Sequence, residues 1–314
     1  MTTVFLGTSE CAAAVLNRLA QEQAHRPALV FTRPDRARGR GRRLTSPPVA
    51  ETARALEIPL EQPDSVNDPG VGERIAEVEP SAVVVCAFGA LIKEPLLSEH
   101  ELLNVHPSLL PRWRGAAPIE RAIMAGDTKT GVSIMRLTAG LDSGPVCLAA
   151  AEPILTGDSH GSLAPRLSGL GGELLVRALE EAPPFVEQGE DGVTYAEKIT
   201  PADRLLDPGR PAAELERVVR ALHPHIGARV ALPDGTLLGV HRAALTGDPP
   251  TGDPPEGADA AQGGEARLGV AARDGRLLLD CNPGVLELLE VQPPGGRAMD
   301  ASSYLHGHGP TGRR

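Results

Sequence analysis

The sequence predicts an α/β protein in which a Rossmann-like, mainly parallel sheet domain is followed by a smaller antiparallel β-barrel domain. Short apolar runs alternate with helical patterns in the first half, which is typical of parallel strands joined by helices. The second half has short apolar runs separated by Asp-Gly turns, which is typical of hairpins. Apolar residues make up 41% of the 314 residues, so both domains can bury a core.

The elements of the sheet domain follow in order from hydrophobic periodicity. Strands are predicted at residues 3–6, 28–32 and 81–87, and helices at residues 11–20, 49–56 and 72–79. Ser9 is placed to cap the first helix. The strand at 81–87 is apolar on both faces, as buried parallel strands are, and right-handed crossovers are expected between the strands.

The first turn argues against a dinucleotide. Gly7 ends the first strand, but no second or third glycine follows where the GxGxxG pattern requires them. The backbone therefore could not approach a pyrophosphate in the usual way. We expect a Rossmann-like sheet that binds no NAD.

The second domain begins after a change in composition near residue 182. A helix is predicted at 212–222, and hairpins pair 228–232 with 236–240 and 268–272 with 276–279. The predicted boundaries are 1–187 for the sheet domain, 188–206 for a linker, 207–308 for the barrel and 309–314 for a tail. Residues 246–265 carry Thr-Gly-Asp-Pro-Pro twice and predict a loop between barrel strands, without a function of its own.

Charge and cysteine usage exclude several classes of protein. The net charge of −10 argues weakly against a nucleic-acid partner, but six arginines lie within the eleven residues 33–43. The four cysteines form no CxxC pair, which argues against a zinc site and a disulfide framework. Neither a secretory leader nor a membrane span is recognisable, so we expect a cytoplasmic protein without a membrane partner.

Polar residues suited to catalysis lie in a predicted strand and in a later turn. Asn104 and His106 project on the same face if residues 102–106 are a strand, because side chains alternate with period two. Asp142 lies on a glycine-flanked turn, where the backbone can bring it close to another element. A lone Asn-x-His pair or a lone Asp in a turn is more often structural, so the trio needs further support.

The trio suits attack by an amine on a formyl carbon. Asn104 can donate a hydrogen bond to the oxygen that becomes negative, which is worth roughly 3–4 kcal/mol. His106 can shuttle protons near neutral pH. Asp142 can hold the imidazole in one tautomer, stabilise its charged form or pass a proton through water. No serine or cysteine lies in a nucleophile motif.

The segment from Asn104 to Ile119 resembles the active-site signature of folate-dependent formyltransferases. That family's pattern is Asn-x-His-x-Ser-Leu-Leu-Pro followed later by Leu-Asp-x-Gly, and further similarity extends over almost the whole chain. The resemblance implies catalytic roles for Asn104, His106 and Asp142. It also implies a second domain like an OB fold.

The same resemblance implies substrates and their contacts. The formyl donor would be 10-formyltetrahydrofolate, with no metal, and its pocket would be formed by Ser108, Leu109, Leu110, Pro111, Phe88, Gly89 and Leu91. The acceptor would be the amino group of initiator methionyl-tRNA, held by the barrel and by an arginine loop comprising Arg36, Arg38, Arg40, Arg42 and Arg43. We expect the chain to act as a monomer.

Two alternatives remain open at this point. A formyltransferase acting on a sugar-nucleotide amine would share the trio and the folate loop but would have less need of the arginine loop. A pure RNA-binding protein would leave Asn104, His106 and Asp142 unexplained.

Overall fold

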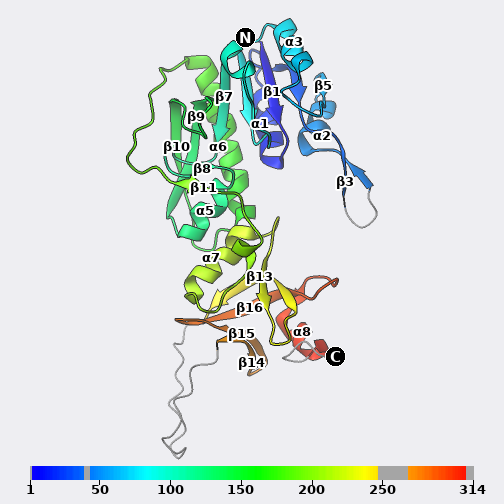
Figure 1. Cartoon of the computed structure of the whole chain (residues 1–314), viewed down its shortest axis with the longest axis vertical. Coiled ribbons are helices and arrows are strands. Elements are labelled where there is room, and N and C mark those ends of the chain that lie inside the picture. Colours follow the sequence, from blue (N-terminus) through cyan, green and yellow to red (C-terminus); the bar gives the residue numbers. More distant parts are fainter. Residues whose placement is uncertain (1, 39–42, 247–267, 309–314) are drawn as a thin grey trace, which may run out of the picture. The chain divides into compact units, whose positions relative to one another are not determined.

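A computed structural model of the chain describes residues 2–38, 43–246 and 268–308 (Figure 1). The chain divides into two compact units. The first comprises residues 1–119, 128–154 and 162–197, and the second comprises residues 120–127, 155–161 and 198–314. Within the described ranges, no helix combines the length and apolarity needed to cross a membrane.

The first unit is built on a seven-stranded sheet with the order β10-β9-β7-β6-β1-β2-β5. Its strands are β1 (Thr3–Gly7), β2 (Pro27–Phe31), β5 (Leu60–Glu61), β6 (Ala82–Cys86), β7 (Leu102–His106), β9 (Lys129–Arg136) and β10 (Val146–Pro153). The pairs from β5 to β7 are parallel, and β9 and β10 add antiparallel strands at one edge. The predicted Rossmann-like, mainly parallel sheet is confirmed.

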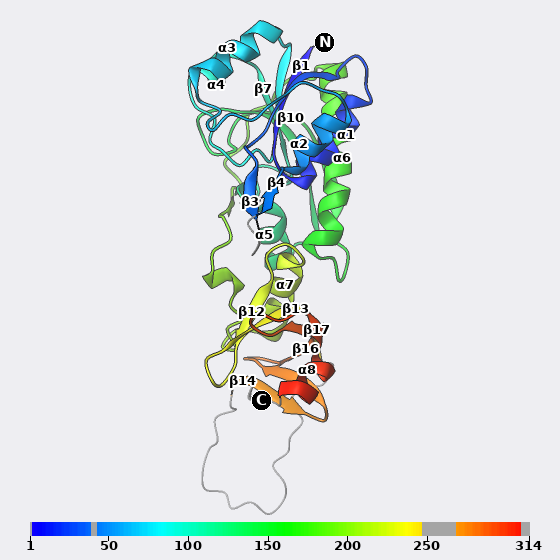
Figure 2. The same cartoon turned by 90° about the vertical axis from the view of Figure 1, so that its right-hand side faces the viewer.

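Helices cover both faces of this sheet. They are α1 (Glu10–Ala20), α2 (Pro48–Ala55), α3 (Pro69–Val78), α4 (Leu96–Glu99) and α6 (His160–Glu181), and α5 (Pro118–Ala125) follows β7. Figure 2 shows α1, α2 and α6 on one side of the sheet and α3 and α4 on the other. The Ser9 hydroxyl caps α1 as predicted, because it accepts a hydrogen bond from the backbone N–H of Ala12 at 3.3 Å.

Side-chain alternation sorts the strand residues between these two layers. Val4, Leu6 and Val83 pack in the core that α3 contributes to, whereas Val105 faces Gly171 of α6. Gly7 has a packing role. A Cβ at this position would lie 2.8 Å from the Cβ of Ala12 and 3.0 Å from the carbonyl oxygen of Cys86. Glycine therefore allows α1 to approach the end of β1 closely, and no dinucleotide is required to explain it.

The second unit contains an antiparallel sheet with the order β12-β13-β16-β15-β14, and β17 pairs with β16. Its elements are η1 (Ala202–Arg204), α7 (Ala212–Leu222), β12 (Ala228–Ala231), β13 (Leu237–Leu245), β14 (Gly269–Arg273), β15 (Arg276–Asp280), β16 (Val285–Gln292), β17 (Met299–Asp300) and α8 (Ala301–His308). Both predicted hairpins and the helix at 212–222 are confirmed. The predicted OB-like barrel is a curled sheet, or half-barrel.

The core of this unit lies between the curled sheet and its helices. Leu215 and Leu222 of α7 pack with Leu277 of β15, Leu288 of β16 and Tyr304 of α8, and all five are buried. Aliphatic side chains dominate because only 2% of the chain is aromatic. The predicted loop from residue 247 to residue 265 and the predicted tail at 309–314 lie outside the described residues.

An ion pair inside the second unit gives a stability prediction. The Arg121 guanidinium donates two hydrogen bonds to Asp203, at 2.8 and 3.2 Å, and holds the pKa of that carboxyl at about 2, below its ordinary value of 3.8. A lowered folded-state pKa stabilises the fold fully above pH 3.8, and this contribution is lost as the pH falls through about 2.

We therefore expect Asp203→Asn to lower the free energy of unfolding by about 1 kcal/mol at neutral pH, after allowance for solvent screening. The difference from the wild type should shrink as the pH is lowered from about 4 to about 2. Urea titrations across this range measure it. Arg177→Ala, which removes an exposed pair with Glu181 on α6, is the control and should cost less than about 0.5 kcal/mol. Equal costs for the two variants would contradict the prediction.

Candidate active site

The end of β7 carries the first two residues of the predicted trio. Asn104 and His106 lie on the same face of β7, as the strand alternation predicts. β7 is an inner strand between β6 and β9, and both residues are almost fully enclosed, with exposed fractions of 9% and 4%. The site lies at the carboxyl edge of the parallel strands, where α/β sheets commonly bind ligands.

The turn after β9 brings the third residue to them. Oδ2 of Asp142 lies 3.7 Å from Nδ1 of His106, and Oδ1 accepts a long hydrogen bond of 3.5 Å from Nδ2 of Asn104. Oδ2 also accepts a hydrogen bond of 2.8 Å from the backbone N–H of Gly115. The structure thus brings together all three residues that the sequence singles out.

The backbone around Asp142 is held under strain. Asp142 has φ of 43°, in the left-handed region that favours glycine. Two residues later, a Cβ at Gly144 would lie 2.0 Å from the carbonyl oxygen of Arg136, so only glycine fits there. Such a conformation persists because neighbouring contacts hold the turn in place.

The tautomer of His106 follows from its other ring nitrogen. Nε2 lies 2.9 Å from the carbonyl oxygen of Trp113, which can only accept a hydrogen bond. The neutral ring therefore carries its proton on Nε2, and the lone pair of Nδ1 faces Asp142. Trp113 itself has φ of 64°, and its backbone N–H donates to Oγ1 of Thr194 at 2.9 Å.

Gln188 is a positioning residue that the sequence analysis missed. Its amide donates to the carbonyl oxygens of Asp142 at 2.8 Å and Gly144 at 2.7 Å, and its Oε1 accepts from Nε of the buried Arg114 at 3.0 Å. Gln188 falls at the start of the predicted linker at 188–206 but belongs to the first compact unit. No local pattern could have identified it, because its partners lie 44 and 46 residues away.

Gln188→Ala is expected to lower the single-turnover rate of the expected formyl transfer by about tenfold. Three hydrogen bonds of roughly 1 kcal/mol each would be lost, two of them to the turn itself, and the strained Asp142 turn would relax. Rapid-quench kinetics with saturating co-substrate measure the rate. Gln292→Ala is the matched control, since Gln292 donates to the backbone oxygen of Gly296 in the second unit. An unchanged rate for Gln188→Ala would show that the turn holds without it.

The predicted folate loop lies directly after β7. Ser108 is fully buried, and its hydroxyl donates to the carbonyl oxygen of Arg112 at 2.6 Å. Ser133 of β9 links this loop to the sheet, because its hydroxyl donates to the Ser108 carbonyl oxygen and accepts from the Leu110 N–H. The Ser108 side chain therefore shapes the loop from within. Leu109, Leu110 and Pro111 are partly exposed and available for contact.

The second predicted folate segment borders a cavity of about 390 Å³. Its lining includes Phe88, Gly89 and Leu91, together with residues 63–67 and Arg33. Leu91 is 69% exposed, whereas Phe88 packs in the core and its carbonyl oxygen already accepts a hydrogen bond from Thr8. The predicted trio is not part of this cavity's lining, so the cavity accounts for one predicted folate segment only.

The predicted arginine loop belongs to a two-stranded ribbon that follows β2. Its strands are β3 (Arg36–Arg38) and β4 (Arg43–Thr45), with Arg36 paired to Thr45 and Arg38 to Arg43. Arg36 is exposed, and Arg40 and Arg42 lie outside the described residues. The ribbon is anchored at its base by Asp35, which accepts hydrogen bonds from Gln62 at 2.7 Å and from Ser46 at 2.9 Å. These bonds lower the pKa of Asp35.

Comparison with known proteins identifies both halves of the chain. A model described as formyl transferase matches residues 1–179, and a model described as formyl transferase, C-terminal domain matches residues 198–309. The chain belongs to the formyl transferase family. The predicted family is thus confirmed over nearly the whole sequence.

Two named relatives align with this chain over almost its whole length. A methionyl-tRNA formyltransferase from Halorhodospira halophila is 41% identical over 310 residues, which are 97% of this chain and 95% of the relative. One from Methylococcus capsulatus is 39% identical over 320 residues, covering 100% of this chain and 99% of the relative. The predicted enzyme class, a formyl transferase, follows from the family.

A solved structure shares the fold at low identity. The N-formyltransferase from Helicobacter canadensis, in complex with folinic acid and dTDP-3-aminofucose, aligns with a TM-score of 0.62 and 12% identity, covering 91% of this chain and 98% of that one. At that identity the likeness concerns the fold alone.

Proposed function

We propose that this formyl transferase moves the formyl group of 10-formyltetrahydrofolate to the free amino group of initiator methionyl-tRNA, giving N-formylmethionyl-tRNA for translation initiation. The observation that carries the chemistry is the convergence of Asn104, His106 and Asp142 at the end of β7. The acceptor is supported by the two relatives described above. Both carry the name methionyl-tRNA formyltransferase, and both align with this chain over nearly their whole length.

His106 serves as the proton shuttle. The folate carrier supplies an electrophilic formyl carbon, and the attacking amine must lose a proton as the new C–N bond forms. Nδ1 of neutral His106 has its lone pair available, since Nε2–H donates to the Trp113 carbonyl oxygen. The proton taken up at Nδ1 would face Asp142, 3.7 Å away, and could then pass to the leaving nitrogen of the carrier.

Asn104 and Asp142 stabilise the charges that develop during the reaction. Nδ2 of Asn104 makes a long contact of 3.5 Å with Asp142, and with two N–H groups it retains capacity to donate to the oxygen of the tetrahedral intermediate. Asp142 is kept in place by the Gly115 N–H, so its carboxylate stabilises the protonated ring of His106 without having to reorganise. No covalent bond to the enzyme is required.

The carrier is held by two segments of the first unit. Leu109, Leu110 and Pro111 offer partly exposed apolar contacts beside the trio, and Ser108 stabilises their loop from inside. Phe88, Gly89 and Leu91 border the 390 Å³ cavity, where backbone groups can hydrogen-bond a flat heterocycle. Neither contact set requires a metal or a nicotinamide.

The tRNA is bound by the arginine loop and the second domain. Arg36, Arg38, Arg40, Arg42 and Arg43 concentrate positive charge on a chain with net charge −10. In this proposal, residues 1–187 catalyse, residues 188–206 connect and residues 207–308 add contacts to the tRNA. The chain acts as a monomer in the cytoplasm, where its substrates are made and used.

A direct competition assay tests the acceptor. The full chain receives 10-formyltetrahydrofolate with either charged initiator tRNA or a nucleotide-linked amino sugar, and product formation is followed for both. We expect formylation of the tRNA at a kcat/KM at least about 10³-fold higher, because a site selects by transition-state contacts that the small acceptor lacks. A preference for the amino sugar would support the alternative acceptor and overturn the proposal.

A further inference from the structure

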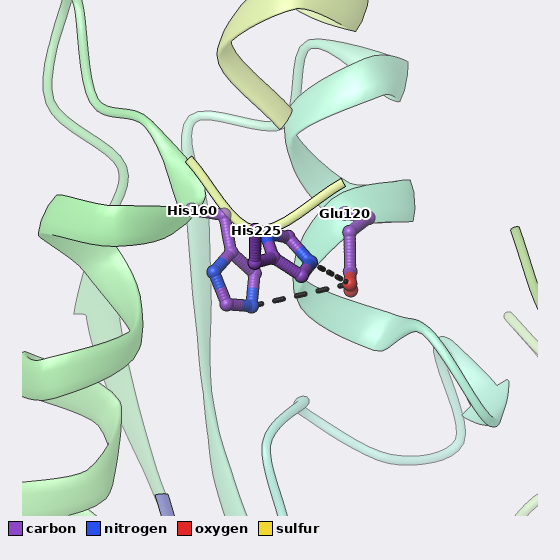
Figure 3. A group of neighbouring side chains, drawn as sticks. All are labelled: Glu120, His160 and His225. Carbon is purple, nitrogen blue, oxygen red and sulfur yellow. Dashed lines mark hydrogen bonds and ion pairs between the residues drawn. The ribbon is translucent and has the colours of Figure 1, made fainter. Parts of the chain in front are cut away.

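Three potential metal ligands meet in the second unit, and none of them belongs to the trio, the predicted folate contacts or the arginine loop. Glu120 lies on α5, His160 is the first residue of α6, and His225 lies in the turn after α7. Figure 3 shows both imidazole rings directed toward the Glu120 carboxylate. All three ligand atoms lie within 4.8 Å of one another, and all three residues belong to the same compact unit.

The spacing of these atoms suits a small cation. Oε1 of Glu120 lies 2.9 Å from Nε2 of His225 and 3.9 Å from Nε2 of His160. Ligands about 2.0–2.1 Å from a tetrahedral ion are separated by about 3.3 Å. The two observed distances lie on either side of this value, so shifts of about half an ångström would place an ion among the three atoms.

We propose that Glu120, His160 and His225 form a divalent-cation site with zinc as its preferred ion. Two imidazole nitrogens and one carboxylate oxygen are a ligand set typical of zinc, and hard ions such as Mg²⁺ prefer sites made of oxygen alone. An ion pair between Glu120 and His225 would explain one contact. It leaves unexplained why Nε2 of His160 points at the same oxygen from beyond hydrogen-bonding distance.

The two histidine segments are held together without any ion. The backbone N–H of Gly161 donates to the carbonyl oxygen of His223 at 3.1 Å, and Arg220 donates to that of Asp158 at 2.6 Å. A Cβ at Gly161 would lie 2.7 Å from Cδ of Pro224, so glycine permits this close approach. As a result the rings of His160 and His225 stack, with their centroids 3.7 Å apart. The two imidazoles are therefore held side by side before any ion binds, and binding requires only the small shifts given above.

The carboxylate comes from a third segment that is fastened to the same scaffold. Nε of Arg217 on α7 donates to the carbonyl oxygen of Met124, one turn beyond Glu120 on α5. A bound ion would join α5, the start of α6 and the turn after α7, which are distant in sequence. Its function would be to cross-link the second unit, so we expect it to raise thermal stability.

The fourth coordination position is open to a small ligand. Three side chains leave a tetrahedral ion one position short, and the His225 side chain is 33% exposed, so water can complete the shell. The partly closed geometry favours a structural role over catalysis.

The test uses the full chain without a histidine tag, stripped with chelator and titrated with zinc chloride. We expect one zinc per chain by calorimetry and elemental analysis. The thermal transition of the second unit should rise by roughly 5–10 °C at a free zinc concentration of about 100 times Kd. Cobalt should give the visible absorption of a four-coordinate site with histidine ligands.

Three single variants and a control decide the assignment. Glu120→Gln, His160→Gln and His225→Gln should each weaken zinc binding by at least about 100-fold, since even outer-shell changes cost about 10–100-fold. Glu120→Gln is nearly isosteric and keeps the fold measurable. The control is His306→Gln with His308→Gln, which removes another closely spaced histidine pair on α8 and should bind zinc like the wild type.

Two results would overturn the proposal. One is a wild-type chain that binds no zinc at micromolar concentrations of the free ion. The other is zinc binding that persists in all three single variants, or that disappears only in the control. Either would leave Glu120 and His225 as a simple ion pair beside a second imidazole.

Discussion

Replacing His106 with alanine is expected to lower the single-turnover rate of formyl transfer by about 10²–10⁴-fold. The imidazole is the one group of the trio that can both take and return a proton near neutral pH, and its Nδ1 faces Asp142 from 3.7 Å. Binding of the folate carrier should change little, because the ring is assigned to proton movement. Rapid-quench kinetics with bound donor and fluorescence titration with tetrahydrofolate measure the two effects separately.

A second variant of the trio and a control variant serve as comparisons for His106→Ala. Asn104→Ala should cost about 10²–10³-fold, the usual effect of removing an oxyanion donor. His306→Ala, on the exposed face of α8, is the control and should leave the rate unchanged. A His106→Ala enzyme with near-normal turnover would exclude the proton-shuttle role, while loss of folate binding in the same variant would point to a structural role instead.

Replacing both Arg40 and Arg42 with alanine is expected to weaken tRNA binding by at least about 100-fold. Hydrogen bonds to charged groups are worth about 1.5–3 kcal/mol each, and arginine matches the geometry of a phosphate. The slope of log affinity against log salt should flatten by roughly one unit for each lost phosphate contact. Filter binding of initiator tRNA across a salt series measures both quantities.

The matched control removes two arginines from helix surfaces. Arg74 on α3 and Arg177 on α6 pair with Glu61 and Glu181, so their loss changes the net charge equally without touching the arginine loop or the second domain. This double variant should bind tRNA with nearly the wild-type salt slope. If the Arg40/Arg42 variant formylated tRNA normally at every salt concentration, the loop would have no part in recognition and the sugar-type acceptor would gain support.

Much of the fold was predictable because local signals agree with the tertiary structure. The helix at 212–222 begins and ends as predicted, since its apolar stripe is long and continuous. The strand at 82–86 has an all-apolar pattern that only a buried parallel position accommodates. The predicted second domain is confirmed as a curled antiparallel sheet, and its half-barrel form is seen only in the structure, because hairpin signals specify neighbouring strands but not how a sheet closes.

The candidate site was predictable in its residues but not in its geometry. Alternation along β7 places Asn104 and His106 on one face, and the glycines around Asp142 indicate a close approach. The supporting contacts were not visible, since Gln188 reaches the Asp142 turn from 46 residues away. The tautomer of His106 likewise depends on a carbonyl oxygen in the following loop.

The sequence alone therefore predicts the fold class, the family and the residues of the candidate trio, because these depend on periodicity and on short contiguous motifs. The meeting of Glu120, His160 and His225 belongs to the folded chain. Their segments are separated by 40 and 65 residues and converge only through contacts such as that of the Gly161 N–H with the His223 carbonyl oxygen. Long-range packing of this kind has no local signature, since each partner looks like an ordinary polar residue in its own segment.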